Sequence, residues 1–187
     1  GGNAVANVML CWPNYVDDGA VLPVGAWSEG LPLAHALDPL LGVRVRSVDS
    51  LPAHTVVGVD LGRVRVVRAL ALVDHNLSVH AIYRITGSND AEFSDIAVQT
   101  DWREVWSIVY PYGALAWEDR NFWTGRPEQE DVNGWRVDLM HVLGSKTLAR
   151  YWRIEIHDDN PAGYIEFGRL FVGGAWQPEY NMSYGCS

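Results

Sequence analysis

The clearest alternation of apolar and polar positions lies between residues 151 and 173. Trp152, Ile154 and Ile156 alternate there with polar or charged residues, and this period of two predicts a strand with one buried face. A stretch rich in Asp, Asn, Pro and Gly follows, as expected for a turn. The apolar positions then change phase at Gly168, which predicts a bulge that resets the buried face. Two such strands need further sheet to cover their apolar faces.

Other short runs rich in Val, Ile and Leu are bounded by Gly, Pro, Asp and Asn, which is typical of strands. The predicted strands are 5–12, 43–47, 55–61, 64–74 and 79–87, with a tight turn at 61–63. A short helix is expected at 33–37, because Asp38-Pro39 directly after it disfavours further helix. No linker divides the chain, so we predict one domain over residues 1–187, an all-β antiparallel sandwich with little helix.

Several segments, taken in order, resemble the discoidin-like or galactose-binding-like jelly roll. RYWRIEI, a turn and IEFGRLFVGGAW are similar to the last strands of that fold, and VVGVDLGRVRVVRALALVDHNL is similar to its third and fourth strands. IYRITGSND resembles the strand that follows, and LPLAHALDPLLGVRVRS resembles the short helix and Asp turn near the start. The matches extend from Leu31 to Trp176. The resemblance implies a discoidin-like jelly roll whose terminal strands lie side by side.

The segments DHNLS and, near the end of the sequence, GRLFVGGAWQPEYN are most similar to small jelly-roll proteins of the tail tips of tailed phages. This resemblance implies a structural protein of a tail tip or baseplate, located in the virion and assembled in the bacterial cytoplasm. Its expected partners are other tail-tip proteins and copies of itself in a symmetric assembly, together with carbohydrate on the host surface.

Charge and composition limit the classes of partner that the protein can have. The formal net charge of -9 argues against a nucleic-acid backbone as partner, and no apolar run is long enough to span a bilayer. Nine tryptophans are many for 187 residues, and Trp is typical of all-β cores, sugar-binding faces and protein interfaces alike.

Four aromatic residues are candidates for contact with a ligand or partner. They are Trp27 in a connection rich in Gly, Pro and Asp, and Trp102, Tyr112 and Trp123 in the irregular region 89–134. One interpretation is a stacking platform for a sugar ring or a set of anchors for a neighbouring subunit. The other is an aromatic core patch beneath loops.

The resemblance also raises two structural hypotheses. In sugar-binding jelly rolls, an Asp after the short helix and a Glu in the last strand help to hold a structural calcium ion, and Asp38 and Glu166 match these positions. The alternative is that Asp38 caps a turn. Some members of the family join their terminal strands by a disulfide, which implies a Cys11–Cys186 bridge. Two reduced thiols are the alternative, and a cytosolic assembly would favour them.

We find no nucleophile–base pair, zinc-ligand spacing or phosphate-binding loop in the sequence. Asp74 next to His75 suits the end of a strand better than acid–base chemistry. We therefore expect a protein that is not an enzyme and needs no cofactor beyond the hypothetical calcium. Two functions stay open: a structural and binding protein of a phage tail tip, or a carbohydrate-binding module whose main role is glycan recognition.

Overall fold

The computed structural model describes residues 8–106, 127–132 and 137–177. It is built almost entirely of antiparallel strands, and in these residues the longest helix has five residues. None of the described helices is long and apolar enough to cross a membrane. The helices are two 3-10 turns, η1 (Tyr15–Asp18) and η2 (Leu33–Leu37), and the short α1 (Gln129–Val132). The strands are β1 (Leu10–Asn14), β2 (Ala20–Val21), β3 (Val45–Arg46), β4 (Val56–His75), β5 (Ile82–Ser88), β6 (Ile96–Gln99), β7 (Arg103–Glu104), β8 (Val137–His157), β9 (Glu166–Phe167) and β10 (Arg169–Trp176).

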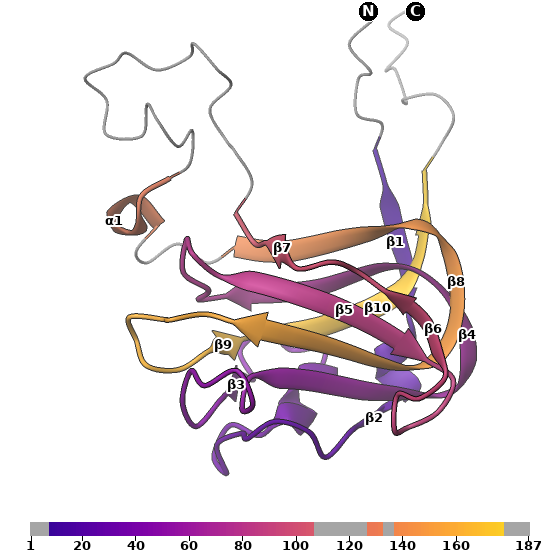
Figure 1. The fold of residues 1–187 in the computed structure, drawn as a ribbon, viewed down its shortest axis with the longest axis horizontal. Coiled ribbons are helices and arrows are strands. Elements are labelled where there is room, and N and C mark those ends of the chain that lie inside the picture. Colours follow the sequence, from indigo (N-terminus) through magenta and orange to yellow (C-terminus); the bar gives the residue numbers. More distant parts are fainter. Residues whose placement is uncertain (1–7, 107–126, 133–136, 178–187) are drawn as a thin grey trace, which may run out of the picture.

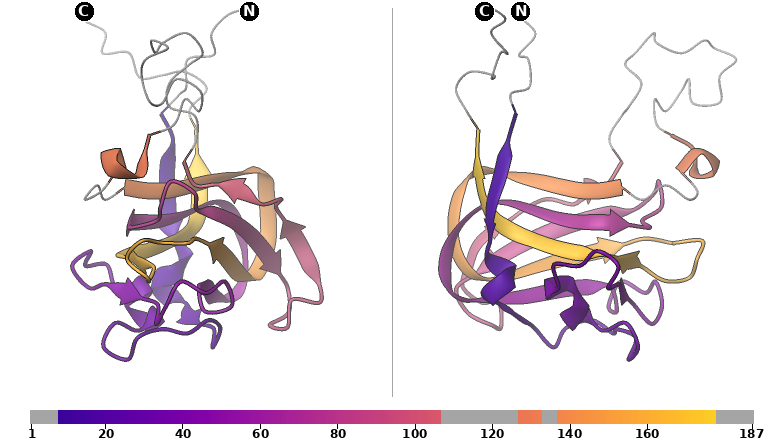
Figure 2. Two further views of the ribbon diagram at one scale, coloured as in Figure 1. Left: turned by 60° about the vertical axis from the view of Figure 1, so that its left-hand side comes forward. Right: turned by 180° about the vertical axis from the view of Figure 1, so that it is seen from behind.

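Two long bent strands, β4 and β8, organise the sandwich. They pair with one another along most of their length, and each belongs to both layers (Figure 1). The strand order is β1-β10-β4-β8-β5-β6, with β2 on β4 and β7 on β5, and β3 and β9 form a separate pair. The second half of β8 pairs with β5 and the first half of β4 lies on its other side in the same layer, whereas the other halves of β4 and β8 lie in the layer of β10. The sheet thus folds over on itself (Figure 2).

The predicted turn at 61–63 is wrong, because β4 runs through these residues without ending. The chain bends there instead. Gly62 has a φ of +73°, which favours glycine, and its N–H donates to the carboxylate of Asp60 at 2.8 Å. Arg150 of β8 donates two hydrogen bonds to the same carboxylate, at 2.7 and 2.8 Å. These contacts hold the two strands together at the bend.

The face assignment of the closing strands is confirmed. Trp152, Ile154 and Ile156 are buried, and they pack with residues of both layers in one core cluster. The phase change at Gly168 marks the point where the chain leaves β9, paired with β3, and enters β10, paired with β4. The 3-10 turn at 33–37 is at the predicted place.

The first and last described strands are neighbours, as the resemblance implied. β1 pairs antiparallel with β10, with Leu10 opposite Trp176 (Figure 2). The strand predicted to end at residue 12 extends further, since β1 continues to Asn14, whose side chain accepts a hydrogen bond from the Val172 N–H at 3.0 Å. Cys11 lies in this strand as a free thiol, whereas its proposed partner Cys186 lies outside the described residues.

Candidate ligand-binding groove

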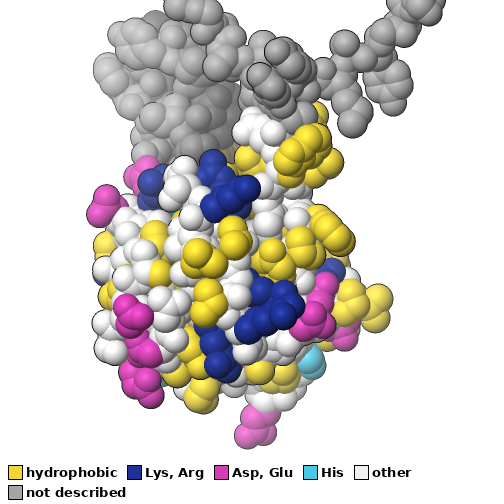
Figure 3. Space-filling model, turned by 90° about the vertical axis from the view of Figure 1, so that its right-hand side faces the viewer, with side chains coloured by type: hydrophobic (Ala, Val, Ile, Leu, Met, Phe, Trp, Pro, Cys, Tyr) yellow, Lys and Arg dark blue, Asp and Glu magenta, His cyan; other side chains and the backbone are white. Residues whose placement is uncertain are grey.

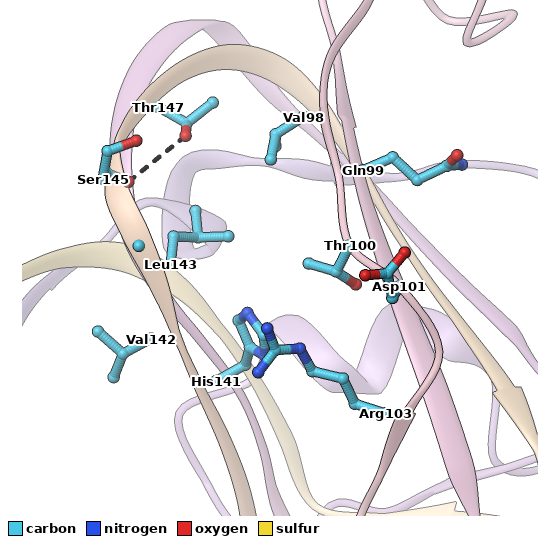
Figure 4. Close-up of a pocket in the computed structure, with 11 residues that line it drawn as sticks. Val98, Gln99, Thr100, Asp101, Arg103, His141, Val142, Leu143, Ser145 and Thr147 are labelled. Carbon is cyan, nitrogen blue, oxygen red and sulfur yellow. Dashed lines mark hydrogen bonds between the residues drawn. The ribbon is translucent and has the colours of Figure 1, made fainter.

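A groove of about 310 Å³ opens between the β6–β7 edge of one layer and the bent strand β8 of the other, a size within the range of small-molecule sites (Figure 4). We call it the edge groove. Most of its lining side chains carry hydrogen-bonding groups. From the β6–β7 edge these are Gln99, Thr100, Asp101 and Arg103, and from β8 they are His141, Ser145 and Thr147.

The β6–β7 side of the groove is an edge held to β5 at two points. Gln99 pairs with Thr86 and Arg103 pairs with Tyr83, whereas residues 100–102 are not part of the strand pairing with β5. Thr100 anchors this short crossing, because its N–H donates to the Ile85 carbonyl at 2.9 Å and its hydroxyl accepts from the Ile85 N–H at 3.0 Å. The crossing therefore presents side chains at a defined position beside the groove.

The β8 side owes its shape to a wide bulge. Thr147 pairs with Val67, but the next pair joins Val142 to Ala69, so four residues of β8 stand against one of β4. The guanidinium of Arg68 donates a hydrogen bond to the carbonyl of Leu143 within the bulge. Ser145 lies in this bulge, is exposed and lines the groove.

At the inner end of the groove, His141 is hydrogen-bonded to Tyr83. The Tyr83 hydroxyl lies 2.9 Å from His141 Nδ1, and the two rings meet edge to face at 5.7 Å. Burial lowers the pKa of His141, and the positive charge of Arg103 lowers it further. Burial raises the pKa of Tyr83. The pair is therefore neutral at pH 7, and a neutral imidazole offers one donor and one acceptor.

Arg103 brings a positive charge to the groove. Within the described part of the chain its guanidinium forms no hydrogen bond or ion pair. Figure 4 shows its side chain extending from the β7 side toward His141. Together with the hydroxyl of Ser145, it gives the groove donors and an acceptor suited to a ligand rich in hydroxyl groups.

Trp102 lies on the opposite side of the same edge, on the outer face of β5 and β8. Its ring centroid is 4.1 Å from that of His157, and the Arg84 guanidinium carbon lies 4.7 Å from its centroid. Glu155 holds Arg84 through hydrogen bonds of 2.9 and 3.0 Å. The indole remains 36% exposed, so this predicted contact residue is held in place and accessible.

The other predicted contact residues are not gathered at the groove. The Trp27 ring packs edge-on against Phe167 at 6.0 Å, and its Nε1–H donates to the Val24 carbonyl at 3.0 Å. Trp27 is therefore part of the margin of the core, which corrects its interpretation as an anchor at a loop tip. Tyr112 and Trp123 lie outside the described residues.

The two carboxylates of the calcium hypothesis have other contacts. Asp38 accepts the Leu40 N–H at 2.8 Å, as in a capped turn. The oxygens of Glu166 accept hydrogen bonds from Arg44 at 3.0 Å and from Arg46 at 2.6 and 2.8 Å. Two guanidinium groups on one carboxylate do not favour a cation there. Within the described ranges no group of three His, Cys, Asp or Glu side chains could hold a metal ion, and calcium stays a prediction.

His141 and Arg103 were not predicted as site residues from the sequence. His141 had a recognisable signal, since it replaces an apolar residue in the inward row Leu139, His141 and Leu143. A buried polar residue at such a position calls for a partner, which is Tyr83. Arg103 had no comparable signal, because the strand β7 is only two residues long.

Comparison with known proteins places the fold. No protein-family model matches the chain, and no curated protein matches it. The chain is similar to the family 32 carbohydrate-binding module of NanJ from C. perfringens, solved with galactose, at 15% identity and a TM-score of 0.56, covering 90% of this chain and all of that one.

Two further solved structures show the same similarity. The first is a chitosan-binding module from a Paenibacillus chitosanase/glucanase, at 16% identity and TM-score 0.52, covering 87% of this chain and 100% of the other. The second is the lectin domain of lectinolysin bound to Lewis b, at 13% identity and TM-score 0.52, covering 88% and 98%. The chain has the discoidin-like β-sandwich fold of family 32 carbohydrate-binding modules.

Proposed function

We propose that the protein recognises glycans and that the edge groove is a binding site for them. The observation that carries the proposal is the groove itself, a space of about 310 Å³ whose lining includes hydroxyl, imidazole and guanidinium groups from two sheet edges. Sugars present alternating donors and acceptors, and such a lining can satisfy them. The exposed ring of Trp102, on the outer side of the same edge, can stack on a further sugar of a longer chain.

The fold supports the proposal without assigning a ligand. The similar structures include a module in complex with galactose, a chitosan-binding module and a lectin domain in complex with Lewis b. Their ligands differ, so the shared sandwich is compatible with several sugars, and the ligand depends on the residues of each site. We propose that this chain acts by binding alone, with no bond made or broken.

A structural role in an assembly is the second candidate, and one surface favours it. At the β1–β10 end the apolar side chains of Leu10, Trp12 and Trp176 are exposed by 51%, 80% and 56%. Exposed aromatic residues of this kind are typical of contact surfaces between proteins. By contrast, the face at the β4–β8 bend mixes hydrophobic side chains with Lys and Arg (Figure 3).

The placement in a phage tail tip, and with it the virion location, rests on the sequence resemblance. The two functions are compatible, because a protein held in an assembly by one surface can bind a host glycan with another. Glycan recognition is the better supported of the two, since the groove and the fold both favour it.

The proposal can be tested by a substitution that blocks the groove. Ser145→Trp places an indole at an exposed groove position, and Ala91→Trp adds the same ring at an exposed position outside the lining. On a glycan array and by calorimetry with the glycans that bind, Ser145→Trp should weaken binding at least tenfold and Ala91→Trp should leave it unchanged. Wild-type protein that binds no glycan, or equal binding by all three proteins, would refute the proposal for this groove.

A further inference from the structure

Resting on the proposed glycan binding, we propose that the edge groove selects saccharides that carry a carboxylate, and that Arg103 binds this group. The ligand class is therefore an acidic saccharide with a uronic or sialic acid residue, as distinct from a neutral sugar.

Most of the other described arginines form ion pairs, whereas Arg63 and Arg68 form none within the described residues. Arg44, Arg46, Arg84, Arg150 and Arg169 each form hydrogen-bonded ion pairs with Asp or Glu. The chain has 23 acidic residues against 14 Lys and Arg, so carboxylate partners are plentiful. Arg103, however, forms no hydrogen bond or ion pair within the described ranges, although it lines a concave site.

Asp101, two residues away, also lines the groove but lies beyond ion-pair distance of Arg103 in the structure. Asp101 and Arg103 are both exposed, so solvent and salt screen the attraction between them. A guanidinium with no carboxylate of the described chain within ion-pair distance can bind one from a ligand through two parallel hydrogen bonds, and this geometry gives specificity as well as affinity.

The surroundings of Arg103 favour an anion over a second cation. Its positive charge acts on both His141 and Tyr83, since it lowers the pKa of the imidazole and opposes the rise that burial causes in the pKa of the phenol. A ligand carboxylate beside Arg103 would offset this charge. The hydroxyl of exposed Ser145, on the opposite wall of the groove, can bind a hydroxyl group of the same sugar ring. Charge and hydroxyl pattern thus agree on one ligand class.

The experiment compares matched acidic and neutral sugars. Calorimetry would measure wild-type protein with sialyllactose against lactose, and with a galacturonic acid oligomer against a galactose oligomer. We expect at least tenfold tighter binding of the acidic member in one pair. Arg103→Gln should remove that preference by weakening the acidic sugar much more than the neutral one, and Arg103→Lys should restore only part of it. Arg63→Gln, an exposed arginine outside the groove lining, is the matched control.

The outcomes separate this inference from the proposed function. If acidic and neutral sugars bind equally and Ser145→Trp abolishes both, the groove binds glycans but the carboxylate inference is wrong. If a sulfated neutral sugar binds as tightly as its carboxylated counterpart, the groove selects anions in general, and the inferred selectivity for carboxylates is wrong. If wild-type protein binds no sugar of either kind, the proposed function itself fails. Thermal melts of all variants would confirm that each is folded.

Discussion

The buried histidine at the end of β4 makes the stability of this protein depend on pH in a defined window. His75 is 1% exposed, and its Nδ1 accepts the Leu77 N–H at 3.1 Å. Its Nε2 is buried and has no hydrogen-bond partner among the described residues, and its ring meets Trp106 edge-on at 6.3 Å. Burial lowers the pKa of His75 from 6.5 to about 4, although Asp138 and Asp74 act in the opposite direction.

The sign of the effect follows from where protons bind. Between pH 6.5 and 4 the unfolded chain protonates this histidine and the folded chain does not, so acid favours the unfolded state. The stabilisation is fully present above pH 6.5 and is lost as the pH falls toward 4. For these two pKa values, linkage gives a loss of about 2 kcal/mol between pH 7 and pH 5 and about 3 kcal/mol by pH 4. Carboxylates with lowered pKa values, such as Glu166, act mainly below this window.

The assay is urea unfolding followed by tryptophan fluorescence at pH 7 and pH 5. His75→Asn keeps an acceptor near the Leu77 N–H but cannot be protonated. We expect it to be less stable at pH 7 and to lose much less stability on going to pH 5. Some dependence should remain, because the pKa of His141 is lowered in the same direction. The exposed His80→Asn is the control. A wild-type stability that is equal at the two pH values would refute the reasoning, as would an unchanged pH dependence in His75→Asn.

Three further predictions concern packing and metal. In denaturant unfolding, Ile154→Ala should lower stability by about 2–5 kcal/mol, because it leaves a cavity in the core. Leu148 is exposed, so Leu148→Ala should lower stability by less than about 1 kcal/mol. Equal losses would mean that the buried face of the strand is misassigned. Trp27→Ala should lower stability by about 2–3 kcal/mol and leave glycan affinity unchanged, because the Trp27 ring packs on Phe167. If the variant is as stable as wild type but calorimetry shows weaker glycan binding, Trp27 is a ligand contact instead. Since Arg44 and Arg46 bind Glu166, EDTA should not change the melting temperature, and a fall that added calcium reverses would establish the ion.

The regular part of the fold could be predicted because its signal is local. The period of two in Trp152, Ile154 and Ile156 indicates which side of a strand is buried, and a Gly at the phase change marks the passage from β9 to β10. The predicted turn at 61–63 failed for a tertiary reason. Gly62 has the local character of a turn, but Arg150, distant in sequence, binds Asp60 and holds β8 at the bend, so that β4 resumes its pairing with β8 at Arg65.

The groove could not be predicted, because no local pattern encodes it. Its two walls come from segments about forty residues apart, 98–103 and 141–147, and they meet only when the sheet folds over. The bulge in β8 depends on pairing with β4, and the importance of Arg103 depends on the absence of a carboxylate within reach in the described structure. Such properties belong to the three-dimensional arrangement, whereas Trp102 was proposed as a contact residue from its irregular setting alone and stays a prediction.

The order of the strands also governs how the chain can fold. β1 and β10 are neighbours although their residues lie some 160 positions apart, and β4 joins β8 across about 80 positions. Contacts between such distant segments form slowly, because loop closure costs entropy before the contacts can offset it. During synthesis, β4 can pair only after β8 has been made, and β1 only after β10, the last strand of the described residues. We therefore expect no stable sandwich before translation has passed β10, and until then the apolar edges of β1 and β4 depend on the ribosome and chaperones for protection.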